Sequence, residues 1–298
     1  LTSKAFGTFS MAEPYRRLQE RLAHDFTPTI ELCEILPTFV DGAVHQNNRR
    51  LIAKRLSRHK GRQIDAANDF LNGFARDALV PGKSVDLLSE FAEPLFRAMA
   101  RAMLEADQIS ADAADLAQEV PQLFSPTAPL KTRIDINRRL AETFADAAVD
   151  PHDFAAIVLG VKPLTGSLAL SLHAIFANHP DTAMAKMRWP ETLPQSALHY
   201  VDRIALKPVS IGSEAFVPGE RVRCLIQAAA WHESERRSTM FGAGTHLCLG
   251  RPLSELLWKI TVERFAACAL KVATRPISIR ADSEPFHLPK RCDVRFQP

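Results

Sequence analysis

Phe241-Gly-Ala-Gly-Thr-His-Leu-Cys-Leu-Gly250 is a loop segment that directly precedes a stretch with helical periodicity. Its glycines, Gly242, Gly244 and Gly250, allow tight positive-φ turns and a close approach of the backbone to a flat ligand. Cys248 is therefore expected just before the N-terminus of a helix. The positive end of that helix and its free N–H groups favour a thiolate over a thiol. A thiolate at this place is a reactive nucleophile or a metal ligand.

The residues alone leave two interpretations of Cys248 open. It is either a metal ligand or a buried structural cysteine in a glycine-containing turn. A zinc site needs more ligands than the pair His246 and Cys248 provides.

The pattern Phe241-Gly-x-Gly-x-His246-x-Cys248-x-Gly250 resembles the heme-binding loop of the cytochrome P-450 superfamily, with every fixed position present. The resemblance implies heme b as the cofactor and Cys248 as the axial iron ligand. It also implies that Phe241 packs against the sulfur and that His246 points toward a heme propionate. Gly244 and Gly250 belong to the same cofactor-binding set.

A second segment, Asp41 to Arg50, is similar to the C-helix of that family, which carries His-x-x-x-Arg. His45 and Arg49 lie four residues apart and so share one face of a helix. Charge-assisted hydrogen bonds to carboxylates suit these residue types, so we expect both to bind heme propionates. The alternative is a solvated basic helix face.

The resemblance covers roughly Phe39 to the C-terminus and implies a truncated cytochrome P-450-like fold. We expect a mainly α protein with a small β part, forming one heme-thiolate domain over 1–298 with a shortened N-terminal part. Periodicity predicts short strands over 205–231 and a small antiparallel sheet from 272–280 and 293–296. It predicts helices over 11–25, 43–79 (broken near Gly61), 85–106, 131–147, 153–178, 194–206 and 252–270.

Two departures from the family pattern bear on function, and the first is in the Glu-x-x-Arg motif. Arg203 fits the arginine of this motif, but Tyr200 occupies the glutamate position. A tyrosine hydroxyl cannot form the bidentate charged pair that a carboxylate gives to arginine. We expect Arg203 to keep a structural role on a helix, or else to be an exposed helical residue.

The second departure is in the helix that is expected to cross the distal face of the heme. The family usually carries an acid followed by an alcohol there, whereas this chain reads Gly160-Val-Lys-Pro-Leu-Thr165, with no carboxylate. Lys162 and Pro163 resemble the Arg-Pro pair of the peroxygenase branch, in which the cation holds a substrate carboxylate. Lys162 and Thr165 are the predicted catalytic residues. The alternative is that Lys162 reaches solvent and Pro163 only kinks the helix.

A basic run over 49–62 contains eight lysines, arginines or histidines beside the apolar Leu51, Ile52 and Leu56. No aromatic residues interleave, so we expect no nucleic-acid partner. In the family this helix lies on the proximal side of the heme, where an acidic ferredoxin or flavodoxin docks. A solvated helix face is the alternative.

The composition fits a globular protein, with 298 residues, 46% hydrophobic and 24% charged residues, and a net charge of +3. Its five cysteines are unclustered, which predicts no disulfide framework and a cytoplasmic location. The best apolar run, 155–161, is too short to cross a bilayer, so we expect no membrane association.

We therefore expect a heme-thiolate oxidoreductase of the monooxygenase class that acts on a small or medium apolar substrate. Without the usual acid and alcohol, oxygen activation is expected to be atypical and to use peroxide as an alternative oxidant. A non-catalytic heme-binding relative, acting as a partner or regulatory protein, is the other hypothesis.

Overall fold

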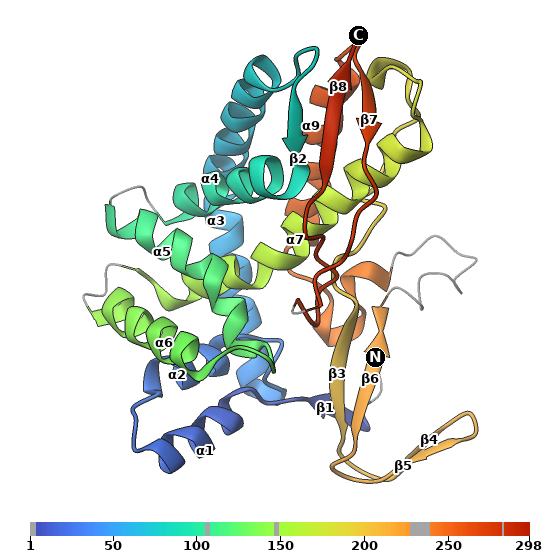
Figure 1. The fold of residues 1–298 in the computed structure, drawn as a ribbon. Helices are drawn as coiled ribbons and strands as arrows, with labels where there is room; N and C mark the ends of the chain where they lie inside the picture. Colours follow the sequence, from blue (N-terminus) through green and yellow to red (C-terminus); the bar gives the residue numbers. More distant parts are fainter. Residues whose placement is uncertain (1–3, 105–107, 146–148, 227–238, 282) are drawn as a thin grey trace.

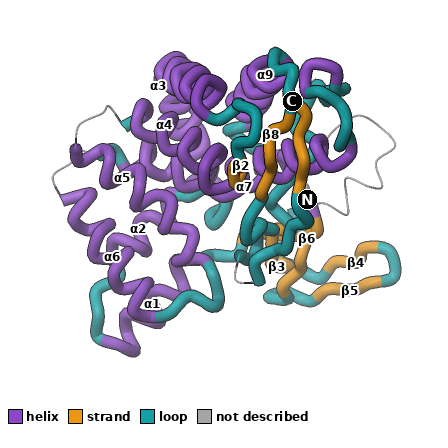
Figure 2. Tube along the Cα trace, turned by 45° about the horizontal axis from the view of Figure 1, so that its top comes forward, coloured by secondary structure: helices purple, strands orange, loops and turns teal. Residues whose placement is uncertain are grey.

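The computed structural model describes residues 4–104, 108–145, 149–226, 239–281 and 283–298. Most helices gather on one side of the molecule and the strands on the other, and both views agree on this division (Figures 1 and 2). The prediction of a mainly α protein with a small β part is confirmed. The α-helices are α1 (Ala12–Leu22), α2 (Thr27–Ile35), α3 (Gly42–Asp77), α4 (Glu93–Met103), α5 (Gln108–Glu119), α6 (Leu130–Ala145), α7 (Pro151–Asn178) and α9 (Arg251–Ala266).

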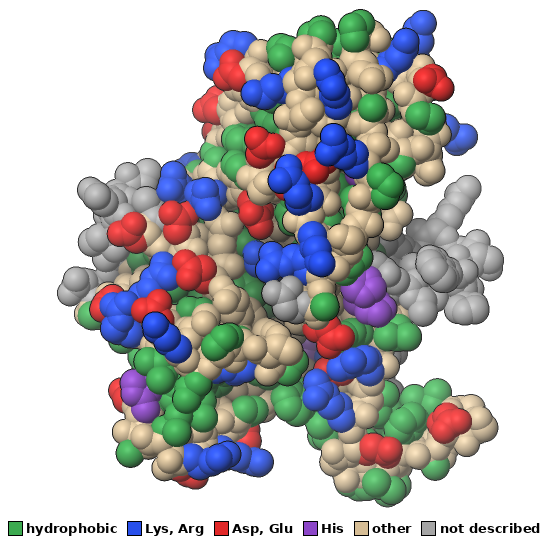
Figure 3. Space-filling view, viewed as in Figure 1, with side chains coloured by type: hydrophobic (Ala, Val, Ile, Leu, Met, Phe, Trp, Pro, Cys, Tyr) green, Lys and Arg blue, Asp and Glu red, His purple; other side chains and the backbone are tan. Residues whose placement is uncertain are grey.

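The described strands form three small antiparallel sheets. The first has the order β1 (Phe6–Thr8), β3 (Tyr200–Ala205), β6 (Arg221–Leu225), and the second has the order β2 (Ser84–Asp86), β8 (Asp293–Gln297), β7 (Lys271–Thr274). The third is the hairpin of β4 (Val209–Ile211) and β5 (Glu214–Phe216), which projects from the body. Hydrophobic side chains gather around this hairpin, where Leu206, Ile211 and Val217 are exposed (Figure 3). The predicted pairing of 272–280 with 293–296 is confirmed for β7 and β8, but the strand ends at Thr274, short of the predicted bound.

Helix α7 is the central element of the core and runs from the helical side of the molecule toward the strands. Asp150 caps its N-terminus by accepting hydrogen bonds from the backbone N–H groups of His152 and Asp153, and Pro151 occupies its first turn. By length and composition alone, α7 would be able to cross a membrane, so the prediction that no stretch is long enough was wrong. However, 72% of its most apolar window is buried inside the protein. A helix that is apolar on every side is expected at the centre of a core.

Helix α3 is continuous, so the predicted break near Gly61 is wrong. Gly61 is exposed, and nothing lies within 4 Å of the position that a Cβ would take. A single helical glycine costs about 1 kcal/mol. The side chains buried on either side of it, including Ile52, His59 and Gln63, hold the helix together across this weak position.

Two other predicted helices differ from the structure. The segment 85–106 begins with strand β2 and continues through a π-helical turn (Leu87–Ala92) before α4 starts. The segment 194–206 is no helix: it contains strand β3, because Tyr200 to Ala205 pair with β6 on one side and β1 on the other. The helices α2 and α5 were not predicted from the sequence.

Candidate functional site

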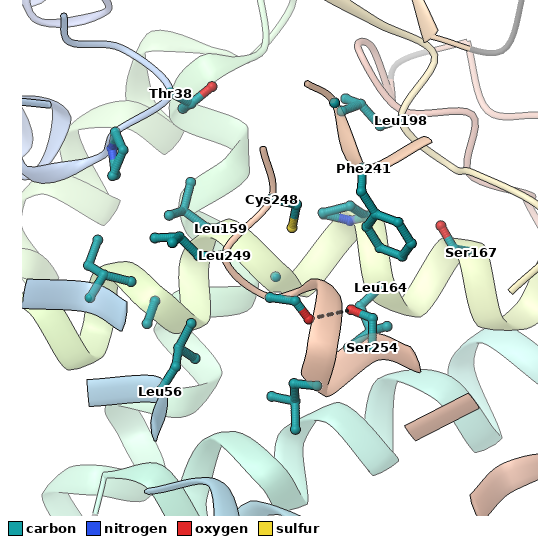
Figure 4. A pocket seen from close by; sticks show the side chains of 18 of the residues that line it. Thr38, Leu56, Leu159, Leu164, Ser167, Leu198, Phe241, Cys248, Leu249 and Ser254 are labelled. Atoms are coloured by element: carbon teal, nitrogen blue, oxygen red, sulfur yellow. Dashed lines mark hydrogen bonds between the residues drawn. The ribbon is translucent and has the colours of Figure 1, made fainter. Parts of the chain in front are cut away.

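A cavity of about 280 Å³ lies between α7 and the loop that carries Cys248. Helices α3 and α4 and strand β3 supply the other walls. Figure 4 shows the sulfur of Cys248 pointing into this space, with the ring of Phe241 beside it and α7 across from it. The cavity thus joins the predicted cofactor loop to the predicted distal helix.

Local hydrogen bonds give the cysteine loop its shape. The N–H of Cys248 donates to the carbonyl of Phe241 at 2.8 Å, and the N–H of Leu247 donates to that of Gly244 at 3.2 Å. Gly242 and Gly244 have φ angles of 74° and 62°, which glycine adopts without strain. Gly250 differs from the prediction, because its φ is −79°. An added Cβ there would lie 3.7 Å from the Cys248 sulfur, so its small size leaves room beside the sulfur.

Cys248 precedes α9 by three residues, as predicted; the residue is exposed, and its sulfur points into the cavity (Figure 4). Burial raises the pKa of the Cys248 thiol above its ordinary value. The backbone N–H groups of Gly250 and Arg251 and the charge of Arg49 oppose this rise. The surroundings of Cys248 therefore stabilise its thiolate only in part. A metal cation bound to the sulfur would stabilise the thiolate further.

Three basic side chains line one edge of the cavity: Arg49 from α3, Arg203 from β3, and His246 from the cysteine loop. A fourth, His45 of α3, contacts His246. The rings of His45 and His246 lie 4.2 Å apart, and Arg49 Nη2 donates to the carbonyl of Leu247 at 2.8 Å. Burial, with Arg203 and His45 nearby, lowers the pKa of His246 to about 4. Burial and Arg49 lower the pKa of His45.

Asp41 is the carboxylate that faces this basic edge. One of its oxygens lies 3.4 Å from His246 Nε2, and the other accepts hydrogen bonds from the N–H and hydroxyl of Thr8. Burial opposes ionisation of Asp41, but the bonds from Thr8 and the nearby His246 lower its pKa overall. Sequence reasoning missed this role, although an aspartate at the start of a helix is a recognisable signal.

His45 provides a test of whether the basic edge suits an anionic cofactor. Its side chain is buried, and its Nε2 has no hydrogen-bond partner among the described residues. A buried polar atom without a partner costs about 1–3 kcal/mol. A carboxylate placed among His45, Arg49, Arg203 and His246 would satisfy it, so these residues fit a flat group with acidic substituents on one side.

Arg203 lies on strand β3 and not on a helix, which corrects the Glu-x-x-Arg assignment. Its side chain is only 8% exposed and reaches the cavity, where Nη1 donates to the carbonyl of Asp202 at 2.8 Å. Tyr200 faces elsewhere: its hydroxyl donates to Glu284 at 2.9 Å and its ring lies under Arg223. Arg203 is thus a cavity residue whose position sequence reasoning did not anticipate.

The α7 wall of the cavity is mostly apolar. Ile157, Gly160, Pro163, Leu164 and Ser167 line it. Among the described residues that line the cavity there is no aspartate or glutamate.

The structure does not bring the predicted catalytic side chains to this wall. Lys162 pairs with Glu93 of α4, with 3.6 Å between Nζ and Oε1, and is not among the lining residues. Thr165 is fully buried, and its hydroxyl donates to the carbonyl of Val161 at 2.6 Å.

The basic run over 49–62 lies on α3, and some of its side chains have partners within the protein. Arg55 forms an ion pair with Asp150, and Arg50 donates to the side chain of Asn47 at 2.9 Å. Lys54, Arg58 and Lys60 are exposed to solvent. Lys54 and Arg58 are four residues apart and share one helix face, and this exposed face is the part of the run that a partner protein is able to contact.

No protein-family model matches the chain. Cytochrome P450-SU2 of Streptomyces griseolus is 25% identical over 306 aligned positions, which cover 83% of this chain and 74% of that protein. Cytochrome P450 165A3 of Amycolatopsis orientalis is 27% identical over 157 positions, covering 44% of this chain and 40% of that protein.

Solved structures extend the similarity to the whole chain. P450BioI, in complex with a hexadec-9Z-enoic acid-ligated acyl carrier protein, matches with a TM-score of 0.72 at 16% identity and covers 99% of this chain and 89% of its own. P450 RauA, with a biosynthetic intermediate of aurachin RE, also has a TM-score of 0.72, at 17% identity, and covers 100% and 88%. The predicted fold is therefore confirmed over the whole chain, in a version shorter than these structures.

Proposed function

We propose, because this chain is a distant member of the cytochrome P450 superfamily, that it binds heme b through the thiolate of Cys248 and oxidises a small or medium apolar substrate. The superfamily consists of heme-thiolate monooxygenases, so the reaction class follows from membership. The substrate, the oxidant and the roles of individual residues are our proposals. The observation that carries them is the meeting of the Cys248 sulfur and three basic side chains on one cavity, with His45 in contact with one of the three.

The chain's own residues divide the work of holding the cofactor. Cys248 would hold the iron through its sulfur, and Phe241, beside it, would exclude water from the sulfur. Gly244 provides the turn that closes the loop, and Gly250 leaves space next to the sulfur. When bound, heme supplies a redox-active iron whose thiolate ligand favours cleavage of the O–O bond.

The basic edge of the cavity is the proposed site of the heme propionates. His45, Arg49 and His246 are the residues that the sequence motifs nominate, and Arg203 joins them from β3. Before the propionates bind, Asp41 would hold His246 in place. Binding of the propionates would give the buried Nε2 of His45 the partner that it lacks.

Oxygen activation is proposed to be atypical, because the described cavity lining offers no carboxylate. Peroxide is the alternative oxidant to dioxygen. The orientation of Lys162 toward Glu93 argues against the version in which Lys162 holds a substrate carboxylate. Thr165 would have to give up its bond to Val161 before it was able to act as an alcohol near the oxidant.

The substrate class follows from the rest of the cavity. Away from the basic edge, the walls are formed mainly by apolar side chains such as Phe96, Met99, Met103 and Ile157. Apolar walls with few polar groups bind uncharged, apolar molecules. A ferredoxin or flavodoxin docking on the exposed cations of α3 is the proposed electron donor, by electrostatic steering. The five free cysteines suit a cytoplasmic location.

A non-catalytic heme-binding protein that acts as a partner or regulator is the second candidate. The absence of a carboxylate from the described cavity lining is the observation that favours it. The two candidates differ in turnover and not in heme binding.

The experiment is a product assay with the heme-loaded protein and a panel of apolar substrates. It compares electrons supplied by a ferredoxin system with added hydrogen peroxide. We expect product in at least one arm, with poor recovery of electrons in the product of the ferredoxin arm. Heme binding without product in either arm would favour the regulator, and efficient ferredoxin-driven hydroxylation would refute atypical oxygen activation.

A further inference from the structure

A row of polar side chains lies between α3 and the start of α7, outside the heme site. Arg55, His59 and Gln63 are spaced four residues apart and therefore lie along one face of α3. Asp150 and Asp153 face them from the first turn of α7. Burial increases inward: the exposed fraction of the side chain is 34% for Asp150, 13% for Asp153 and 3% for His59. The row runs from the protein surface into its interior.

The inner members of this row carry buried polar atoms that are not hydrogen-bonded to any described residue. They are both ring nitrogens of His59, Oδ1 of Asp153 and Oε1 of Gln63. His59 Nε2 and Asp153 Oδ1 lie 3.8 Å apart, just beyond a hydrogen bond. The amide nitrogen of Gln63, Nε2, donates to the sulfur of Met103, a weak acceptor, at 3.6 Å. Stability does not explain such a cluster, because packed apolar residues would serve at least as well.

The inner end of the row reaches the cavity. Gln63 is itself a lining residue. Asp153 lies on the same face of α7 as the lining residues Ile157, Gly160 and Leu164, at spacings of four, seven and eleven residues. At a rise of about 1.5 Å per residue, Gly160 is about 10 Å along the helix from Asp153. A few water molecules would span that distance.

We propose that Asp153 and His59 form a proton path from solvent to the cavity, ending at Gln63. When the two side chains approach within hydrogen-bond distance, protonated Asp153 transfers a proton from Oδ1 to His59 Nε2, and the resulting imidazolium releases its Nδ1 proton to a water held near the Gln63 amide. Rotation of the neutral His59 ring then restores the starting tautomer. Asp153 is reprotonated from solvent beside Asp150. One proton enters for each proton that leaves, and no electrons move.

This inference rests on the proposed function, since reduction of dioxygen consumes protons and the cavity lining supplies no acid for them. Asp153 is suited to the donor role, because burial and the neighbouring Asp150 raise its pKa. Arg55, His59 and Arg58 of α3 oppose that rise but do not cancel it. A carboxyl that keeps its proton closer to neutral pH is a better proton donor there.

The first test reads the protonation of Asp153 directly and does not depend on turnover. Infrared spectra of the full-length protein are recorded across pH, and the Asp153 carboxyl band is assigned by its loss in Asp153→Asn. We expect a protonated band that persists above the pH at which ordinary aspartates ionise, and that shifts when His59 is replaced in His59→Gln. A band that is insensitive to His59→Gln would overturn the shared proton, whether or not heme is bound.

The second test measures coupling in the heme-loaded protein fed by a ferredoxin system. His59→Gln and Asp153→Asn are expected to release several times more hydrogen peroxide per electron consumed and to show a larger solvent isotope effect. Asp153→Glu should restore the wild-type values, which loss of packing alone would not allow. The matched control is Asp181→Asn, the same change on the exposed segment after α7, with no effect expected.

The two tests separate the failure of this inference from that of the proposed function. If thiolate-ligated heme is present and both variants keep wild-type coupling, the proton path is wrong and the proposed function stands. If no heme is bound, the proposed function fails, and the infrared band still decides whether Asp153 and His59 share a proton.

Discussion

The two walls of the cavity differ in how their side chains are used. The wall formed by the cysteine loop, β3 and the start of α3 presents a sulfur and three basic side chains. His45, which contacts His246 of this wall, has a buried nitrogen without a hydrogen-bond partner among the described residues. The α7 wall presents mainly apolar groups, and the hydroxyl of its Ser167 already accepts a hydrogen bond from the N–H of Ala197. Lys162 and Thr165 do not line this wall: Lys162 pairs with Glu93, and Thr165 donates to the carbonyl of Val161. The first wall is prepared for a cofactor. The second lacks the acid that oxygen activation normally needs.

The largest effect is expected where α7 packs most tightly. A Cβ added at Gly166 would lie 2.6 Å from both Ala197 Cβ and Leu288 Cδ2, so Gly166→Ala must push α7 away from the segments that carry these two residues. We expect a loss of about 2–3 kcal/mol in the free energy of unfolding, measured by urea denaturation. Gly61→Ala on α3 is the control, with a gain of about 0.5–1 kcal/mol, since its Cβ meets nothing. An equal response of the two variants would show that the α7 wall is not closely packed.

The next effect concerns the basic edge. Arg203→Gln removes a buried cation, and hydrogen bonds to charged groups contribute about 1.5–3 kcal/mol. Heme affinity, measured by titrating the heme-free protein, is therefore expected to fall about ten- to hundredfold. The control is Arg223→Gln on the neighbouring strand β6, where Arg223 stacks on the ring of Tyr200. This variant should leave heme affinity unchanged. If Arg223→Gln weakens heme binding as much, the effect reflects damage to the sheet.

Two glycines of the cysteine loop allow a finer comparison within one wall. Gly242 has a φ of 74°, and a Cβ there would lie 3.2 Å from the carbonyl oxygen of His246. Gly242→Ala is expected to cost about 1–2 kcal/mol of stability. Gly250→Ala should cost less than Gly242→Ala in thermal or urea unfolding, because Gly250 has an ordinary φ and its Cβ would only touch the sulfur. The reverse order would contradict the loop geometry.

The smallest effect is expected for Lys162. Its ion pair with Glu93 is partly exposed, and such pairs contribute up to about 1 kcal/mol. Lys162→Gln should therefore change stability little and leave peroxide-driven turnover unchanged. A large loss of peroxide-driven activity would mean that Lys162 turns into the cavity and acts there after all.

The difference between the walls also explains what was predictable. The cysteine loop and the His45 segment are local motifs in which a few adjacent residues fix both geometry and chemistry, so the sequence was sufficient. Arg203 was placed on a helix because Val201, Ile204 and Ala205 recur at the i, i+3, i+4 spacing of a helix face. Only the pairing of β3 with two other strands makes it a strand. The direction of Lys162 depends on Glu93, far away in the chain, which no local pattern indicates.

The most direct measurement is the absorption spectrum of the heme-loaded, reduced protein with carbon monoxide. The account predicts the Soret shift that is typical of thiolate-ligated heme, lost in Cys248→Ser and kept in Cys268→Ser. A spectrum without that shift, or one that survives Cys248→Ser, would contradict the assignment of Cys248 as the iron ligand.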